Sequence, residues 1–194
     1  EEDPEARRRR EADRRKRLEA EEARRRETAS RRARRAADLW REAVPDAPLL
    51  RDYLEARGVR TDALRRLFDG GVPPSLRLIE RLEHWREGAD PRRDPPDHVG
   101  PAMIGFIGAS DLGGFAGVHR TWITAEGRAR YADGGKVPKQ WLGRTGSIWG
   151  LPVRLSPPAP VVFVGEGIET SLAFFSRLLE DGREGIAAEA ALSR

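Results

Sequence analysis

The segment Val161–Thr170 constrains the fold of this chain most, because it joins an apolar run, a glycine-flanked turn and a helical pattern. Residues 161–164 are all apolar and three of them are valines, so they predict a buried β-strand. Residues 168–179 predict a helix, and the turn between the two presents one acid, Glu166. Open α/β sheets bind their ligands at the carboxyl ends of the strands, which is where this order of elements places Glu166.

The residues alone allow other interpretations of this turn. Gly165-x-Gly167-x-x-Thr170 imitates a dinucleotide-binding fingerprint, but Thr170 replaces the third small residue and the charge of Glu166 would repel a pyrophosphate. A simpler alternative is an exposed carboxylate in a turn without a chemical role. Glu169, in the first helical turn, has a comparable alternative, because an acid there interacts favourably with the helix dipole.

Residues 40–157 predict a small α+β domain. Three short helices are expected where apolar residues recur at helical spacing and glycines follow, at residues 49–57, 62–68 and 75–88. A β-hairpin is expected from the apolar runs 103–107 and 115–123, which flank a Gly-rich turn at 111–114. Residues 141–149 predict a further strand or an extended loop.

Residues 1–39 predict a long charged helix. Residues 1–35 hold 15 Lys and Arg against 10 Asp and Glu, which leaves 21 against 22 in the remainder of a chain whose net charge is +4. Leu18 is the only large apolar residue before Leu39, so no coiled-coil stripe exists. Six acid–base pairs spaced four apart support the helix: Glu5–Arg9, Glu11–Arg15, Asp13–Arg17, Glu21–Arg25, Glu22–Arg26 and Glu27–Arg31.

Two roles for this charged arm remain open. In the first, its arginine clusters contact phosphates of DNA or RNA without sequence specificity and with strong salt dependence. In the second, the arm is a solvated, self-paired spacer, which the ten interleaved acids favour.

Composition excludes several classes of protein. The chain has no Cys, so a Cys-ligated zinc site is not within it and no disulfide indicates an oxidising compartment. No apolar run approaches the roughly 18 residues of a membrane span, and no signal peptide pattern is present. A cytoplasmic location is therefore the default expectation, with no membrane partner.

His119 and Arg120 lie in the middle of a predicted strand, where they are candidates to face a nucleotide or a template strand. The alternative is that His119 is an ordinary surface or hydrogen-bonded residue of that strand.

The predicted loop that leads to the Glu166 strand combines positive charge with an aromatic ring. Lys136, Lys139 and Arg144 lie close in sequence to Trp141, a combination that suits contact with a single-stranded backbone and stacking on its bases. The alternative is that Trp141 belongs to the core and that the three cations are solvated.

The run Glu166-Gly167-Ile168-Glu169-Thr170 resembles the first motif of a Toprim domain, the catalytic fold shared by bacterial-type primases, topoisomerases and some nucleases. The amino-acid sequence of this run is similar to the form of the motif found in primases of phages, plasmids and other mobile elements. Four upstream segments resemble the domain that precedes Toprim in those primases: Trp40, Asp52–Val59, Pro101–Ile104 and His119–Trp122.

The resemblance implies an α+β or α/β chain in three parts. These are a charged helical arm at residues 1–39, an α+β domain at 40–157, and the first strand, turn and helix of a Rossmann-like Toprim sheet at 158–194. It further implies that the chain is a piece of a longer enzyme, because a second acidic motif, Asp-x-Asp, is absent from residues 170–194.

The activity implied is that of a DNA primase, which makes RNA primers on single-stranded DNA from nucleoside triphosphates by Mg²⁺-dependent nucleotidyl transfer. Glu166 matches the acid of the motif, which acts in acid/base chemistry or in Mg²⁺ binding, and Glu169 falls where related primases often carry a second acid. A helicase domain or protein is a further partner that the resemblance leaves open. Since one or two carboxylates need further ligands to hold Mg²⁺, the isolated chain is expected to have little or no activity.

Two alternatives stay open beside primer synthesis. One keeps the Toprim fold and assigns strand cleavage, as in nucleases and topoisomerases. The other is a non-enzymatic nucleic-acid-binding module.

Overall fold

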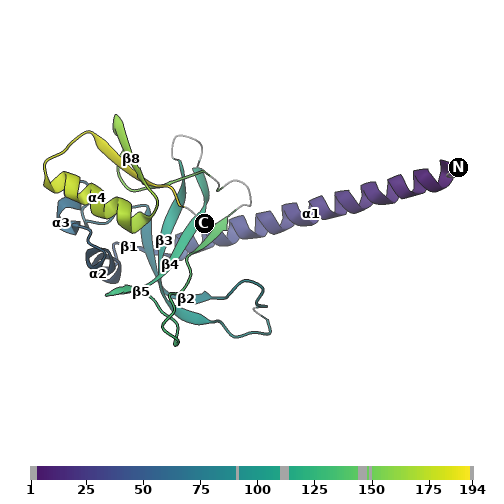
Figure 1. Ribbon diagram of the computed structural model, residues 1–194, viewed down its shortest axis with the longest axis horizontal. Helices are drawn as coiled ribbons and strands as arrows, with labels where there is room; N and C mark the ends of the chain where they lie inside the picture. Colours follow the sequence, from purple (N-terminus) through teal and green to yellow (C-terminus); the bar gives the residue numbers. More distant parts are fainter. Residues whose placement is uncertain (1–3, 91, 110–113, 144–147, 149, 193–194) are drawn as a thin grey trace.

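The computed structural model describes residues 4–90, 92–109, 114–143, 148 and 150–192, and it has a mixed α and β architecture (Figure 1). A long helix, α1 (Pro4–Glu42), extends from a body of two sheets and three shorter helices. None of the helices in the described ranges is long and apolar enough to cross a membrane.

The predicted long charged helix is confirmed in α1. Four of the expected ion pairs form, Glu5–Arg9, Glu21–Arg25, Glu22–Arg26 and Glu27–Arg31, whereas Glu11 pairs with Arg7 and Arg15 with Glu19. The side chains described before residue 29 are exposed, while Ala36 and Leu39 are buried against the body. The helix is therefore an arm over most of its length and a packed element only in its last turns.

The main sheet is antiparallel, with the order β1-β2-β3-β4-β5 and with β6 also paired to β4. Its strands are β1 (Val44–Pro45), β2 (Leu76–His84), β3 (His98–Ala109), β4 (Gly114–Thr124), β5 (Gly127–Arg128) and β6 (Gln140–Gly143). The pairing of β3 with β4 confirms the expected hairpin, whose turn at 110–113 lies outside the described residues.

Both faces of the main sheet are covered, which explains the nearly continuous apolar runs in its strands. Alternate residues of a strand point to opposite faces. Met103 and Ile107 of β3 pack with α2 (Pro48–Ala56) and α4 (Ile168–Glu180), whereas Ala102 and Ile104 pack with the last turns of α1. Figure 1 shows α1 and the shorter helices on opposite sides of this sheet.

The expected helix at 75–88 is wrong, because this segment forms strand β2. Leu76 and Leu78 pack on the face of α2 and α4, and Leu82 packs on the face of α1. A β-bulge between Ile79 and Leu82 adds one residue and reverses the faces. The bulge places leucines at spacings of two and four, which hides the alternation of a strand and imitates helical spacing. Of the other two expected helices, α2 is confirmed, and α3 (Thr61–Leu64) is shorter than the predicted 62–68.

The expected strand, turn and helix around Glu166 are confirmed as β8 (Val161–Gly165) followed by α4. Helix α4 leads to β9 (Ile186–Ala190), which runs parallel to β8 and antiparallel to β7 (Val153–Arg154). The prediction that β8 is buried is wrong, since Val161 and Val164 are 58% and 54% exposed. The reason is that β8 pairs only with β9 among the described strands and so lies at the edge of its sheet.

Gly165 fixes how closely β8 approaches α4. A Cβ atom at this position would lie 2.4 Å from Oγ of Ser171, so any other residue requires the Ser171 side chain, the strand or the helix to move. Ile168 and Leu172 of α4 belong to the same buried cluster as Leu50 and Tyr53 of α2. The turn that carries Glu166 is thus held against the main sheet through α4.

Candidate functional site

A cavity of about 760 Å³ lies between the end of the main sheet near β5 and the turn from β8 to α4. Eight charged side chains line it. Five are cations and three are acids: Arg57, Arg128, Arg130, Lys136 and Lys139, with Glu126, Glu166 and Glu169. A concave surface with an excess of positive charge attracts anions.

Glu166 lies at the rim of this cavity, exposed in the turn that follows β8. Because β8 and β9 are parallel, their carboxyl ends meet at one edge, and this is the edge that the cavity adjoins. Glu166 thus follows the carboxyl end of a strand and lines a cavity, and its role there stays a prediction.

Glu169 is 5% exposed and forms a buried polar contact with residues of two distant segments. Its Oε1 accepts a 2.6 Å hydrogen bond from the Tyr53 hydroxyl of α2, and its Oε2 accepts a 2.9 Å bond from the Lys139 ammonium. The carboxylate therefore joins α4, α2 and the segment before β6 at the base of the cavity.

The electrostatics of this contact favour the charged carboxylate. Burial alone would raise the pKa of Glu169, but the charge of Lys139 and the hydrogen bonds from Tyr53 and Lys139 outweigh it and lower this pKa to about 2. Burial, followed by the neighbouring Glu169 charge, raises the pKa of the Tyr53 hydroxyl. At neutral pH the Tyr53 hydroxyl is therefore protonated and donates its hydrogen bond to the ionised carboxylate of Glu169.

His119 lines the same cavity from β4 and is 2% exposed. Burial, and then the charge of Lys139, lower its pKa to about 3. The ring is therefore neutral at neutral pH, with Nδ1 3.4 Å from the Thr121 hydroxyl. A neutral imidazole offers one donor and one acceptor to a ligand.

Arg120 does not accompany His119 to this cavity. Neighbouring residues of a strand point to opposite faces, and Arg120 projects to the α1 side of the sheet. The two residues were predicted together, but the structure assigns them to different surfaces.

Part of the basic loop predicted around Lys136, Lys139 and Arg144 lines the cavity. Lys136 and Lys139 line it, while Arg144 lies outside the described residues. Trp141 packs against the main buried cluster and is half-buried, so it belongs to the core only in part.

Sequence reasoning did not single out Arg57, Arg128 and Arg130. After β5 the chain folds back, and Arg130 and Lys136 form an antiparallel β-bridge. This places Lys136 beside Arg130, and both line the cavity together with Arg128. The alternation Arg128-x-Arg130 was the available signal, since it places two cations on one face of an extended segment.

The fit of the cavity to Mg²⁺ rests on Glu166. A metal ion would have to displace Lys139 or Tyr53 to reach the oxygens of Glu169. The side chain of Glu166 is exposed to solvent and lines the cavity. The described residues contain no group of three or more His, Asp or Glu side chains arranged to hold a metal ion. Mg²⁺ needs only one or two carboxylates when substrate phosphates and water complete its shell, so Glu166 suits a site that the substrate completes.

Residues 30–149 match the model of a family described as a domain of unknown function, DUF7146. The match covers more than half of the chain, and the chain therefore belongs to this family. No curated protein and no solved structure matches the chain. Tyr53, His119 and Lys139 lie within the matched segment, whereas Glu166 and Glu169 lie after it.

Proposed function

We propose that this DUF7146 member binds phosphate groups of nucleoside triphosphates and of single-stranded DNA in the Glu166 cavity, as part of a Toprim-type DNA primase. The observation that carries the proposal is the position of Glu166, which stands at the end of a parallel strand and at the rim of a cavity with five cations. Anion binding next to an exposed acid is the arrangement that metal-assisted phosphoryl chemistry needs.

The fold around Glu166 supports this proposal. The unit β8-α4-β9 has two parallel strands joined by a helix, which is how a Rossmann-like Toprim sheet begins. We propose that β8, β9 and α4 are the first part of such a sheet.

Six of the charged side chains at the cavity then have assigned roles. Arg57, Arg130 and Lys136 hold phosphate oxygens, because guanidinium and ammonium groups form charge-assisted hydrogen bonds with them. Glu166 holds Mg²⁺ or transfers a proton, and Glu169 orients Lys139. When bound, Mg²⁺ stabilises the charge that develops at the reacting phosphate.

The test is the substitution Glu166→Gln in the protein that contains this chain, with primer synthesis on single-stranded DNA as the measurement. We expect nucleotide incorporation to be lost with an unchanged circular dichroism spectrum, because the amide keeps the shape of the side chain but not its charge. Glu184→Gln is the matched control, since Glu184 is exposed and lies outside the cavity. Full incorporation by Glu166→Gln would refute the assignment.

A second candidate function is nucleic-acid binding without catalysis. It is favoured by the excess of cations in the cavity and by the engagement of Glu169 with Lys139. In that case Glu166→Gln binds single-stranded DNA at least as tightly as the wild type, because an acid is removed from a cationic surface, and no primers form with either protein.

Strand cleavage remains a third proposal, which a nicked product without primer synthesis would identify.

A further inference from the structure

A second cationic cavity, of about 340 Å³, lies on the other face of the main sheet, beside α1. It takes residues from α1, β2, β4 and β6, and those that matter here are Arg35, Arg81, Glu83, Trp85, Arg120 and Gln140. This cavity is separated from the Glu166 cavity by the sheet itself, because Arg120 and His119 point to opposite faces.

Arg120 is the unusual residue of this cavity. Its Nη2 donates a 2.9 Å hydrogen bond to Oε1 of Gln140, and its carbon Cζ lies 5.7 Å from the ring centroid of Trp122. Its Nε is buried without a hydrogen-bond partner. No carboxylate of the described residues forms an ion pair with this guanidinium, so a largely enclosed cation lacks a counter-charge.

Arg32 and Arg35 of α1 add positive charge near the Arg120 guanidinium. Burial, and then the charges of Arg32 and Arg35 on α1, lower the pKa of Arg120 to about 10. Glu42 forms a 3.6 Å ion pair with Arg35 and offsets part of that charge. Glu83 lines the cavity but forms no ion pair with Arg120 among the described residues. Arginines from α1 and β4 thus converge on one cavity.

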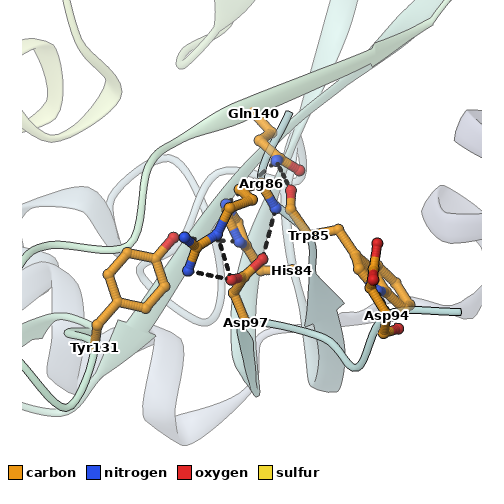
Figure 2. Close-up of polar contacts among 7 residues, drawn as sticks. All are labelled: His84, Trp85, Arg86, Asp94, Asp97, Tyr131 and Gln140. Atoms are coloured by element: carbon orange, nitrogen blue, oxygen red, sulfur yellow. Dashed lines mark hydrogen bonds and ion pairs between the residues drawn. The ribbon is translucent and has the colours of Figure 1, made fainter. Parts of the chain in front are cut away.

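A set of hydrogen bonds holds Arg120 in this position. Figure 2 shows the Gln140 amide beside His84 and the backbone of Trp85. Its Nε2 donates to the Trp85 carbonyl oxygen at 2.8 Å and lies 3.2 Å from Nε2 of His84. Burial lowers the pKa of His84, so its ring is neutral and accepts this contact. The amide oxygen of Gln140 is therefore turned toward Arg120.

Burying a cation without an opposite charge destabilises a protein, unless a ligand supplies that charge. Phosphate fits several guanidinium groups at once, because its oxygens match their forked donors. From the converging charges and the unpartnered donor of Arg120, we propose that Arg35 and Arg120 bind a phosphate group in this cavity. This site does not depend on the Glu166 cavity being catalytic.

The source of the phosphate is best assigned to a nucleic-acid backbone. The exposed surface of α1 continues from Arg32 toward Arg24, Arg25 and Arg26. Arg25 and Arg26 pair with Glu21 and Glu22, and Arg24 adds an exposed cation beyond the cavity. Trp85 is half-buried at the cavity and offers an aromatic face for a neighbouring base. A free phosphate would use the arginines of the cavity but not this extended surface.

The test uses the full chain with the variants Arg35→Gln and Arg120→Gln, and with Arg34→Gln as the matched control. Arg34 is exposed on α1 and does not line the cavity. Binding of a fluorescent oligo(dT) is measured by anisotropy over a salt series. We expect each cavity variant to bind at least about fivefold more weakly, with a log–log salt slope reduced by about 0.7, and the control to bind as the wild type.

A second measurement identifies the source and guards against misfolding. Thermal unfolding is followed with sodium phosphate and with sodium chloride at equal ionic strength, where a bound anion raises the midpoint by mass action. Loss of oligo(dT) binding alone in the variants supports a backbone site, and loss of phosphate stabilisation as well supports a site that also takes free phosphate. If folded Arg35→Gln and Arg120→Gln match the wild type with both probes, the proposal is overturned.

Discussion

At the scale of single residues, the contact of Lys139 with Glu169 is the feature on which both stability and the cavity depend. Glu169 is buried, and its pKa of about 2 keeps it charged at neutral pH. Removal of one partner from a buried ion pair leaves an uncompensated charge, which is more costly than the absence of both.

We predict that Lys139→Met lowers the free energy of unfolding by about 3 kcal/mol, because Glu169 would keep only Tyr53 as a partner. Lys136→Met is the matched control, since Lys136 lines the same cavity but is exposed, and its change should stay within about 0.5 kcal/mol. Urea denaturation at pH 7 measures both. Equal effects of the two substitutions would show that the ion pair contributes nothing.

His119 predicts a dependence of stability on pH. The folded chain takes up this proton only near pH 3, whereas the unfolded chain takes it up near the ordinary histidine pKa of 6.5. The unfolded state therefore holds more protons between these values, and the free energy of unfolding falls as the pH falls. Glu169 contributes in the same direction, but only below its ordinary pKa of 4.5.

Between pH 7 and pH 5 we expect His119→Asn to lose about 2 kcal/mol less stability than the wild type, because the variant has no buried imidazole to keep neutral. The measurement is denaturant unfolding of both proteins at the two pH values, each referred to its own value at pH 7. Parallel losses in the two proteins would contradict a neutral buried His119.

At the scale of elements, the packing of β8 on α4 sets the position of the turn that carries Glu166. Gly165→Ala should lower the free energy of unfolding by about 1–3 kcal/mol, because its Cβ would meet Oγ of Ser171 at 2.4 Å. Ser171→Ala should be neutral or stabilising, since that hydroxyl is buried without a hydrogen-bond partner.

The double variant Gly165→Ala/Ser171→Ala isolates the clash. The Cβ of Ser171 lies 3.4 Å from the added atom, which is close to ordinary contact, so the double variant should recover most of the loss. Additive effects in denaturant unfolding would mean that the glycine is required for another reason.

The elements also show what the sequence can and cannot predict. The β3–β4 hairpin and the β8–α4 turn followed from local patterns, because glycines and prolines fix the ends of apolar runs there. Strand β2 did not, because its bulge reverses the faces and leaves Leu78 and Leu82 at helical spacing. The sequence also did not predict that β8 is exposed. Whether a strand lies at the edge of a sheet depends on which other strands pair with it, and these can be far along the chain.

The same distinction holds within the cavity. Glu166 was predictable because its turn is local, and Lys136 and Lys139 because they cluster in the sequence. The contact of Tyr53 with Glu169 was not, since 116 residues separate the two and nothing in α2 marks a polar role for the tyrosine.

At the scale of the whole molecule, the arm and the body are separable. We predict that deletion of residues 1–28 leaves the free energy of unfolding within about 0.5 kcal/mol of the wild type, because the described side chains before residue 29 are exposed. Arg32 and Arg35 remain in the shortened chain. A lower denaturation midpoint would show that the arm packs on the body in solution.

The same deletion decides between the two roles of the arm. If its arginine clusters contact phosphates, binding of oligo(dT) weakens and its salt slope becomes shallower. If binding is unchanged, the arm is a spacer and the nucleic-acid contacts belong to the body.

The proposed function as a whole depends on one exposed carboxylate that meets phosphates at the end of β8. Calorimetric titration of the chain with ATP, with and without Mg²⁺, tests this directly in the wild type and in Glu166→Gln. We predict that Mg²⁺ strengthens ATP binding to the wild type by at least about tenfold, or about 1.4 kcal/mol, and that the substitution removes this gain. An equal effect of Mg²⁺ on both proteins would contradict the role assigned to Glu166.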